Sequence, residues 1–234
     1  FLKYPPQDLV KTYGRCNQPN ESVLYAAFGI MTVLNECRPH VGDLITESTW
    51  KVKDDQNLKF CPIFRNQPEG EVINPRTFQT NREFERLLRD YPKNTKAQIV
   101  DLTQFVADAF SKRINSNNHL DSVFSAYFSS KSFNELENGT IEAIYYPSVK
   151  DRLSFENISI KPTSFDQKYE LVKVQESVVT IDPSSESSGY GMQTLADSDS
   201  FDHNNQRIVW KKENIRQPKD RIEMLARKSN LNLK

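Results

Sequence analysis

The chain has 234 residues, of which 37% are hydrophobic and 26% are charged, and its 31 Lys and Arg are balanced by 31 Asp and Glu. This composition predicts one domain of ordinary size with an appendage, or at most two small domains, and it excludes a fibrous or wholly disordered chain. A formal net charge of zero also excludes a protein that coats nucleic acid over its whole surface.

The zero net charge is an average over three unlike segments. Residues 1–181 carry 22 basic and 23 acidic side chains, so this part is nearly neutral. Residues 182–206 carry five acidic side chains and no Lys or Arg, whereas residues 207–234 carry nine basic and three acidic ones. We therefore predict a folded domain in the first segment, an acidic flexible linker in the second, and a basic C-terminal tail with a short helix in the third.

The first part of the chain contains short elements of mixed type. Pro5 and Pro6 predict an extended N-terminal stretch, because proline disfavours a helix there. Residues 31–38 predict a helix that Pro39 ends. Three apolar or alternating stretches predict strands, at residues 23–27, 44–45 and 50–64.

Apolar residues at helical spacing predict three helices in the middle of the chain. The helices cover residues 81–91, with Asn81 as the N-cap, and then 96–114 and 120–133. The predicted apolar faces of the last two consist of Ile99, Leu102, Phe105, Val106, Ala109 and Phe110, and of Leu120, Val123, Phe124, Tyr127 and Phe128. Further strands are predicted at residues 141–146, 157–161 and 169–181. Helices flanked by strands on both sides indicate an α+β domain.

No common enzyme signature occurs in the sequence. It has no glycine-rich phosphate loop, no GxSxG and no HExxH motif, and its three His lie far apart. The three Cys lack CxxC spacing, which argues against a disulfide framework or a structural zinc site. We therefore expect a cytoplasmic protein without a metal cofactor. No run approaches the roughly 20 apolar residues that a membrane helix requires, so no membrane partner is expected.

Several polar side chains stand in apolar surroundings. Arg15 lies in a turn-like run, Tyr25 lies inside the first predicted strand, and Glu36 lies on the helix that follows. Ser148 comes at the end of another predicted strand. An ionised carboxylate in such a setting costs several kcal/mol unless it is paired, and Arg15 is the natural partner of Glu36. A structural Arg15–Glu36 ion pair, with Tyr25 in the core, is one interpretation of this set.

Two stretches of the chain resemble the RES domain family. The first, GRCNQPNESVLYAAFGIMTVLNECRPHVG, is similar to that family's Gly-Arg-x-Asn turn, its strand ending in Tyr-x-Ala, and its helix with a Glu eleven residues beyond the Tyr. The second, IEAIYYPSVKDRLSFENISIKP, is similar to a strand ending in Tyr-x-Ser followed by an Asn-containing strand. The two signatures occur in the family's order and lie between residues 5 and 175.

The resemblance implies an ADP-ribosyltransferase-like α+β fold with a central split β-sheet and an inserted block of helices. It also implies an enzyme that consumes NAD by hydrolysis or phosphorolysis of the nicotinamide–ribose bond, as many toxins of Xre–RES toxin–antitoxin pairs do. By residue, it implies that Arg15 contacts the diphosphate of NAD and that Tyr25 packs against the nicotinamide end. Glu36 and Ser148 would flank the scissile bond, Asn17 would brace the turn or touch the ribose, and no metal is required.

Other functions stay open from the sequence. Some RES members transfer ADP-ribose to a protein, so mono-ADP-ribosylation of a protein or nucleic acid is the first alternative. A non-catalytic binding module for protein or nucleic acid is the second, because Trp210 beside Lys211 and Lys212 is a pattern that favours stacking on nucleic acid. The expected partners are NAD, an antitoxin or other inhibitory protein, and a second copy of the chain.

Overall fold

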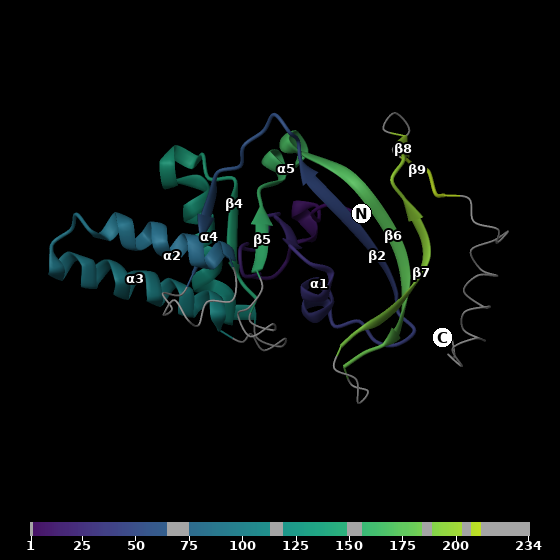
Figure 1. Cartoon of the computed structure of the whole chain (residues 1–234), viewed down its shortest axis with the longest axis horizontal. Helices are drawn as coiled ribbons and strands as arrows, with labels where there is room; N and C mark the ends of the chain where they lie inside the picture. The colour runs from purple at the N-terminus through teal and green to yellow at the C-terminus, as the bar shows by residue number, and fades with distance from the viewer. Residues whose placement is uncertain are drawn as a thin grey trace. The chain divides into compact units, whose positions relative to one another are not determined.

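The computed structural model of the chain contains helices and several β-sheets, which confirms the α+β class (Figure 1). It describes residues 2–64, 75–112, 119–148, 156–183, 189–202 and 207–211. Apart from the two N-terminal residues, the chain forms two compact units, one of residues 3–36 and 57–167 and one of residues 37–56 and 168–234. The boundary therefore differs from the predicted single domain over 1–181, because residues 37–56 pair with the C-terminal part of the chain.

The first unit contains a four-stranded mixed sheet in the order β1-β5-β4-β3. Its strands are β1 (Leu24–Ala27), β3 (Phe60–Pro62), β4 (Ala143–Pro147) and β5 (Glu156–Ile160). β5 pairs antiparallel with β1 and β4, and β3 pairs parallel with β4. β4 and β5 are buried along their whole length, which suits two central strands. Three of the predicted strands are thereby confirmed.

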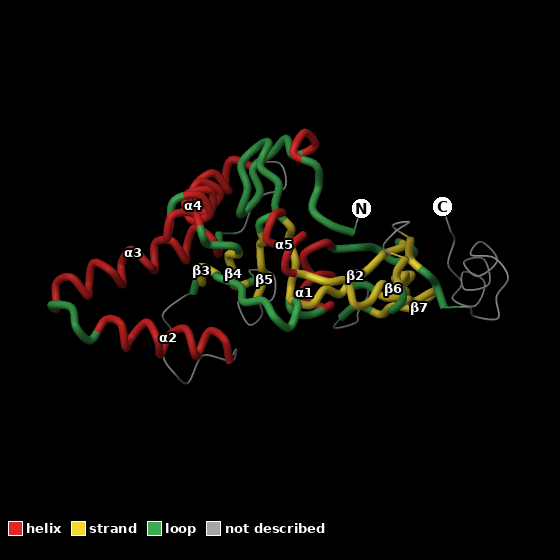
Figure 2. Tube along the Cα trace, turned by 90° about the horizontal axis from the view of Figure 1, so that it is seen from above, coloured by secondary structure: helices red, strands yellow, loops and turns green. Residues whose placement is uncertain are grey.

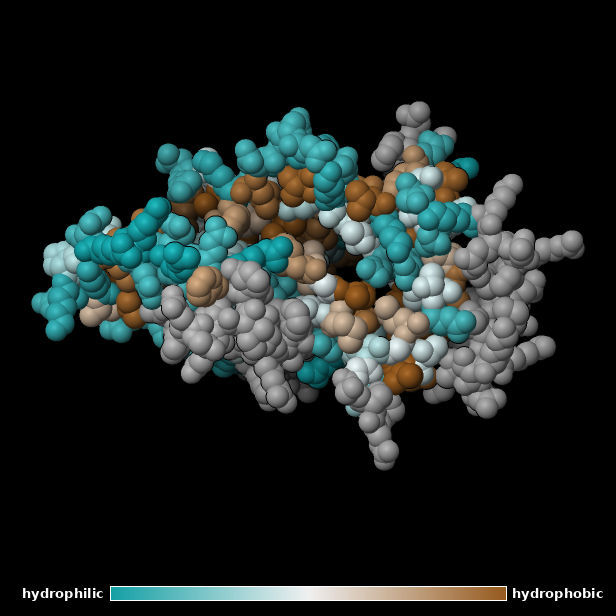
Figure 3. Space-filling model, viewed as in Figure 1, coloured by the Kyte–Doolittle hydropathy of each residue, from teal (hydrophilic) through white to brown (hydrophobic). Residues whose placement is uncertain are grey.

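The helices of the first unit are η1 (Gln7–Leu9), α1 (Ile30–Cys37), α2 (Pro75–Leu88), α3 (Lys93–Ser111), η3 (His119–Ser122), α4 (Val123–Asn134), η4 (Leu136–Gly139) and α5 (Pro162–Lys168). Four of them, α1 to α4, correspond to predicted ones with shifted boundaries, whereas α5 and the short 3-10 helices were not predicted. α2 and α3 form a helical hairpin whose two helices diverge away from the connection between them (Figure 2). On the face shown in Figure 3, hydrophilic residues predominate over the outer end of this hairpin.

The predicted N-cap at Asn81 is wrong. α2 begins at Pro75, six residues earlier, and Asn81 lies inside the helix with only 6% of its surface exposed. Proline suits the first turn of a helix because its fixed φ is already helical and its missing N–H would have no partner there. The residues before Asn81 therefore extend the helix, although they carry little apolar periodicity.

The core of the first unit lies between the sheet and helices α3 and α4. Its buried members are Cys16, Val23, Ile63, Val106, Ala107, Phe110, Phe133, Ile141, Ile144 and Tyr146. The ring of Phe110 packs against the rings of Phe128 and Tyr146, with centroids 6.0 Å and 5.6 Å apart. This aromatic contact places the C-terminal half of α3 over β4.

The apolar faces predicted for α3 and α4 are only partly the buried ones. Leu102 and Phe105 of α3 are 64% and 56% exposed. Most of the apolar residues predicted for the next helix are also exposed, namely Leu120, Val123, Phe124 and Tyr127. α4 instead buries its small side chains, Ser125, Ala126, Ser129 and Ser132, together with Phe133. Short side chains allow a helix to approach the rest of the core closely, so close packing decided which face was buried.

The second unit contains a three-stranded antiparallel sheet in the order β2-β6-β7. Its strands are β2 (Leu44–Val52), β6 (Tyr169–Ile181) and β7 (Gly191–Ser198), and a small ladder joins β8 (Phe201–Asp202) to β9 (Arg207–Ile208). The predicted strand over 169–181 is confirmed from end to end. The strands predicted at 44–45 and 50–64 are redistributed, since β2 continues to Val52 and residues 53–59 are not a strand.

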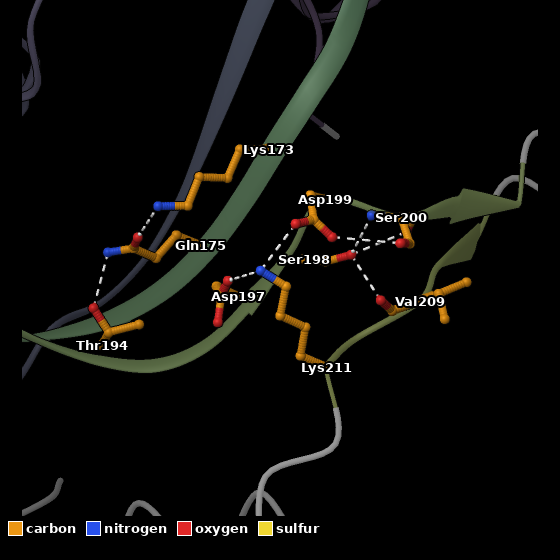
Figure 4. A network of polar contacts seen from close by, with 9 residues as sticks. All are labelled: Lys173, Gln175, Thr194, Asp197, Ser198, Asp199, Ser200, Val209 and Lys211. Carbon is orange, nitrogen blue, oxygen red and sulfur yellow. Dashed lines mark hydrogen bonds and ion pairs between the residues drawn. The ribbon is translucent and has the colours of Figure 1, made fainter.

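The segment predicted as an acidic flexible linker is in part a strand. β7 lies within it and pairs with β6. Asp197 of β7 and Asp199, which directly follows β7, form ion pairs with Lys211 at 2.7 Å and 3.0 Å (Figure 4). Lys211 lowers the pKa of Asp199 by this contact. The acidic segment therefore pairs with the start of the basic one. Residues 212–234, which include the predicted C-terminal helix, lie outside the described part of the chain.

Candidate functional site

The turn predicted around Gly14 is confirmed and is closed by Asn17. The backbone N–H of Gly14 donates to the carbonyl of Asn17 at 3.0 Å, and the two residues form an isolated β-bridge. Tyr25 of β1 anchors this turn, because its hydroxyl donates to Oδ1 of Asn17 at 2.8 Å and accepts from the N–H of Cys16 at 2.7 Å. Asn17 thus braces the turn, which is one of its two predicted roles.

Tyr25 lies partly outside the core, contrary to the structural interpretation of this residue. The residue is 43% exposed, while its hydroxyl reaches the backbone of Cys16, a residue with only 1% of its surface exposed. Burial of this end raises the pKa of Tyr25 well above its ordinary value, so the phenol is neutral and can donate its proton to Asn17. A tyrosine held by its hydroxyl with its ring partly exposed can pack against a planar ligand.

Arg15 contacts the backbone at the end of a helix. Its guanidinium donates through one nitrogen to the carbonyl of Phe110 and through the other to the carbonyl of Lys112 at 3.1 Å. These carbonyls lie at the C-terminal end of α3, where a helix leaves acceptors unsatisfied and a cation is stabilising. The predicted Arg15–Glu36 ion pair is therefore wrong, and the contact of Arg15 with a diphosphate stays a prediction.

Glu36 and Ser148, which the sequence singled out separately, lie in direct contact. The hydroxyl of Ser148 donates to Oε1 of Glu36 at 2.9 Å, and Nδ2 of Asn157 donates to the same oxygen at 2.9 Å. Glu36 is in the last turn of α1, Ser148 directly follows β4 and is fully buried, and Asn157 lies on β5. Hydrogen bonds to an ionised acceptor are about twice as strong as neutral ones, so this carboxylate is held in one orientation.

Asn157 is the site residue that the sequence analysis did not assign. Its place on β5 follows from register, because it pairs with Ala27 of β1 and with Tyr146 of β4. The sequence signal that could have identified Asn157 was the Asn-containing strand in the second RES-like stretch. That signal did not identify a partner, since Asn157 lies 121 residues from Glu36 along the chain.

Tyr146 connects the turn to the carboxylate electrostatically. Burial raises the pKa of Tyr146 well above its ordinary value, and the nearby thiol of Cys16 and phenol of Tyr25 raise it further. The positive charge of Arg15 lowers the pKa of Tyr146, whereas the carboxylate of Glu36 raises it. All of these groups therefore lie within electrostatic range of one buried phenol. The turn and the carboxylate are both attached to the four-stranded sheet, the turn through Tyr25 of β1 and the carboxylate through Asn157 of β5, and these two strands pair.

We expect one of the three cysteines to react with a thiol reagent in the folded protein at pH 8. Burial raises the pKa of Cys16 to about 12 and that of Cys61 to about 11, so both stay protonated, whereas Cys37 is exposed. Counting the modified thiols with a chromogenic disulfide before and after unfolding in urea should give one and then three. Rapid reaction of Cys16 in the folded state would contradict the described packing beside Tyr25.

A groove of about 950 Å³ lies between α3 and α4, and its lining does not include Glu36 or Ser148. Its apolar wall consists mainly of exposed side chains, namely Phe105, Leu120, Val123, Phe124 and Tyr127. Lys112 and Asp121 form an ion pair of 2.7 Å in its lining, which also includes Asp108. Contiguous exposed apolar surface of this kind is typical of a region that contacts another molecule.

No group of three His, Cys, Asp or Glu side chains in the described residues could hold a metal ion. Within the same residues, no helix combines the length and apolarity needed to cross a membrane. Comparisons with known protein families, with curated proteins and with solved structures find no match to the chain. The geometry of the site is therefore the basis on which a function can be argued.

Proposed function

We propose that the chain is an NAD-consuming enzyme of the RES type, with an ADP-ribosyltransferase-like fold, that cleaves the bond between nicotinamide and ribose. The observation that carries this proposal is the carboxylate of Glu36, which Ser148 and Asn157 hold through one oxygen. The strand numbers of the sheets and the order of the elements along the chain support the fold. The two larger sheets have four and three strands, and helices α2–α4 are inserted between β3 and β4 in the sequence.

The chemistry of the bond explains the need for a fixed carboxylate. As nicotinamide leaves with the electron pair of the C–N bond, positive charge develops on the ribose, and a preorganised negative group stabilises it. An oxygen of water or inorganic phosphate then forms the new bond to the ribose carbon, and its proton passes to a base. We assign Glu36 to the stabilisation of this charge, Ser148 and Asn157 to its orientation, and Tyr25 to contact with the nicotinamide ring.

Consumption of NAD would give the chain the role of a toxin or defence effector. Such an activity harms the cell that contains it, so an antitoxin or other inhibitory protein is the partner that we propose. The expected location is the cytoplasm, where the substrate is present. The three cysteines are free thiols, which is compatible with a reducing compartment.

The proposal is tested by incubating the purified chain with NAD and identifying the products by mass. We expect free nicotinamide together with ADP-ribose if water is the acceptor, or with its phosphorylated form if inorganic phosphate is present and accepts. ADP-ribose attached to a protein or nucleic acid would identify the transferase alternative. Absence of nicotinamide with all three kinds of acceptor would exclude an NAD-consuming activity.

A non-catalytic binding module is the second candidate function, and the exposed groove between α3 and α4 favours it. Its wall of exposed apolar side chains suits a protein partner, and the carboxylate of Asp121 in its lining is paired with Lys112. Binding through this groove should persist at high salt, whereas binding of nucleic acid through the basic tail should weaken steeply as salt rises. Either activity should be indifferent to the charge of Glu36.

A further inference from the structure

The groove between α3 and α4 has no part in the reaction assigned to Glu36, since none of the site residues lines it. We propose that this groove and the exposed face of α3 beside it form a contact between two copies of the chain, in which α3 of one copy packs antiparallel to α3 of the other. The inference goes beyond the proposed function and does not depend on it. Such a contact requires a surface that is apolar, large enough and complementary to itself.

Six large apolar side chains form one exposed patch across the two helices, each with between 38% and 64% of its surface exposed. They are Leu102, Phe105, Leu120, Val123, Phe124 and Tyr127. Five of them line the groove, and Leu102 lies one turn before Phe105 on α3. The rings of Phe105 and Phe124 pack edge to face with their centroids 4.9 Å apart, which joins the two helices within the patch. The apolar surface is therefore continuous from α3 to α4.

The patch has the size that a dimer interface needs. A large apolar side chain has on the order of 200 Å² of surface, so the six together leave about 600 Å² exposed. A standard interface buries about 800 Å² on each partner, and about 65% of that area is apolar in homodimers, which is roughly 500 Å². The patch can therefore supply the apolar part of such an interface by itself.

The charges along α3 are complementary to themselves in an antiparallel pair. Four exposed residues follow one stripe of this helix and its C-cap, at intervals of three or four residues. They are Asp101, Phe105, Asp108 and Lys112. In two antiparallel stripes related by a two-fold axis near their middle, Lys112 of one copy lies opposite Asp101 of the other, and this contact occurs twice. Parallel stripes would instead set Asp101 against Asp101 and Lys112 against Lys112, which repel each other.

These features favour a second copy over other occupants of the groove. Two chains with a net charge of zero do not repel each other as a whole, and a net charge near zero promotes association. Lys112 also pairs with Asp121 at 2.7 Å, but 57% of its side chain is exposed and its ammonium has three donors, so it can bind a second carboxylate. An unrelated protein would not need the two ends of one stripe to match each other, whereas an isologous contact does.

The test is the molar mass of the purified chain in solution, measured by sedimentation equilibrium over a range of concentrations. We expect twice the 27.1 kDa of one chain as the concentration rises. Phe105→Glu places a charge in the apolar contact and should weaken the dimer at least about 10-fold. Leu87→Glu is the matched control, because Leu87 is 64% exposed on α2 and does not line the groove. It should leave the association unchanged.

A pair of charge reversals tests the antiparallel arrangement without disturbing Phe105. Asp101→Lys sets like charges opposite each other in both contacts, and so does Lys112→Asp. Each variant alone should therefore associate at least about 10-fold more weakly than the wild type. When the two variants are mixed, opposite charges face each other again in both contacts, and a mixed dimer should form.

A wild-type chain that stays monomeric at every concentration would overturn the proposal and leave the groove to a different protein. A dimer that Phe105→Glu does not weaken would also overturn it, because the contact would then lie elsewhere. The thermal unfolding midpoint of each variant is recorded so that a loss of fold is not taken for a loss of association. Failure of the two folded charge variants to form a mixed dimer would reject the antiparallel contact.

Discussion

Glu36→Gln is expected to lower the rate of nicotinamide release from NAD by at least about 10³-fold, because it removes the charge that would stabilise the developing cation. The substitution keeps an oxygen that can accept the hydrogen bonds of Ser148 and Asn157. The shape of the site should therefore be preserved. The measurement is the initial rate of nicotinamide release at saturating NAD, with the thermal unfolding midpoint recorded in parallel.

Glu83→Gln is the matched control, since Glu83 is 54% exposed on α2 and forms an ion pair with Arg86, three residues away on the same helix. It should leave the rate unchanged. Ser148→Ala and Asn157→Ala each remove one donor to the carboxylate and should cost about 10-fold to 100-fold. A Glu36→Gln enzyme as active as Glu83→Gln would remove this carboxylate from the reaction altogether.

Local sequence patterns predicted the elements of the chain better than their packing. The strand over 169–181 is apolar and β-branched enough to be found from end to end, and β6 has those bounds. β7 was missed because it has few apolar residues, and its pairing with β6 is a tertiary contact that composition does not record. Helical periodicity locates the apolar face of a helix but does not show which face packs against the rest of the protein. For α4 the apolar face was therefore predicted to be the buried one, whereas the face with the serines is buried.

The candidate site was predictable to the extent that its residues carry a sequence signature. The turn at Gly14 and the pair Glu36 and Ser148 lie in the two RES-like stretches, and the structure joins that pair across 112 residues. The partners of Arg15 could not be predicted, because they are backbone carbonyls at the end of α3 and have no side-chain signature.

Gly14→Ala is expected to destabilise the first unit by about 3 kcal/mol, because the added methyl group has no space. A Cβ at this position would lie 2.2 Å from Oδ1 of Asn17 and 2.7 Å from the hydroxyl of Tyr25. Asn17 would have to move, and the hydrogen bonds that close the turn would be lost with it. The shift is measured as the change in the urea midpoint of unfolding by circular dichroism.

Two further variants separate the steric effect from the loss of hydrogen bonds. Gly29→Ala adds the same methyl group where no atom lies within 4 Å. It should lower the free energy of unfolding by less than about 1 kcal/mol, because alanine is less favourable than glycine just before the start of a helix such as α1. Tyr25→Phe keeps the space and removes the hydroxyl, which leaves the N–H of Cys16 and Oδ1 of Asn17 without this partner and should cost about 1–3 kcal/mol. If Gly14→Ala were no worse than Gly29→Ala, the turn would tolerate a side chain, and the tyrosine–asparagine contact would not be what holds it closed.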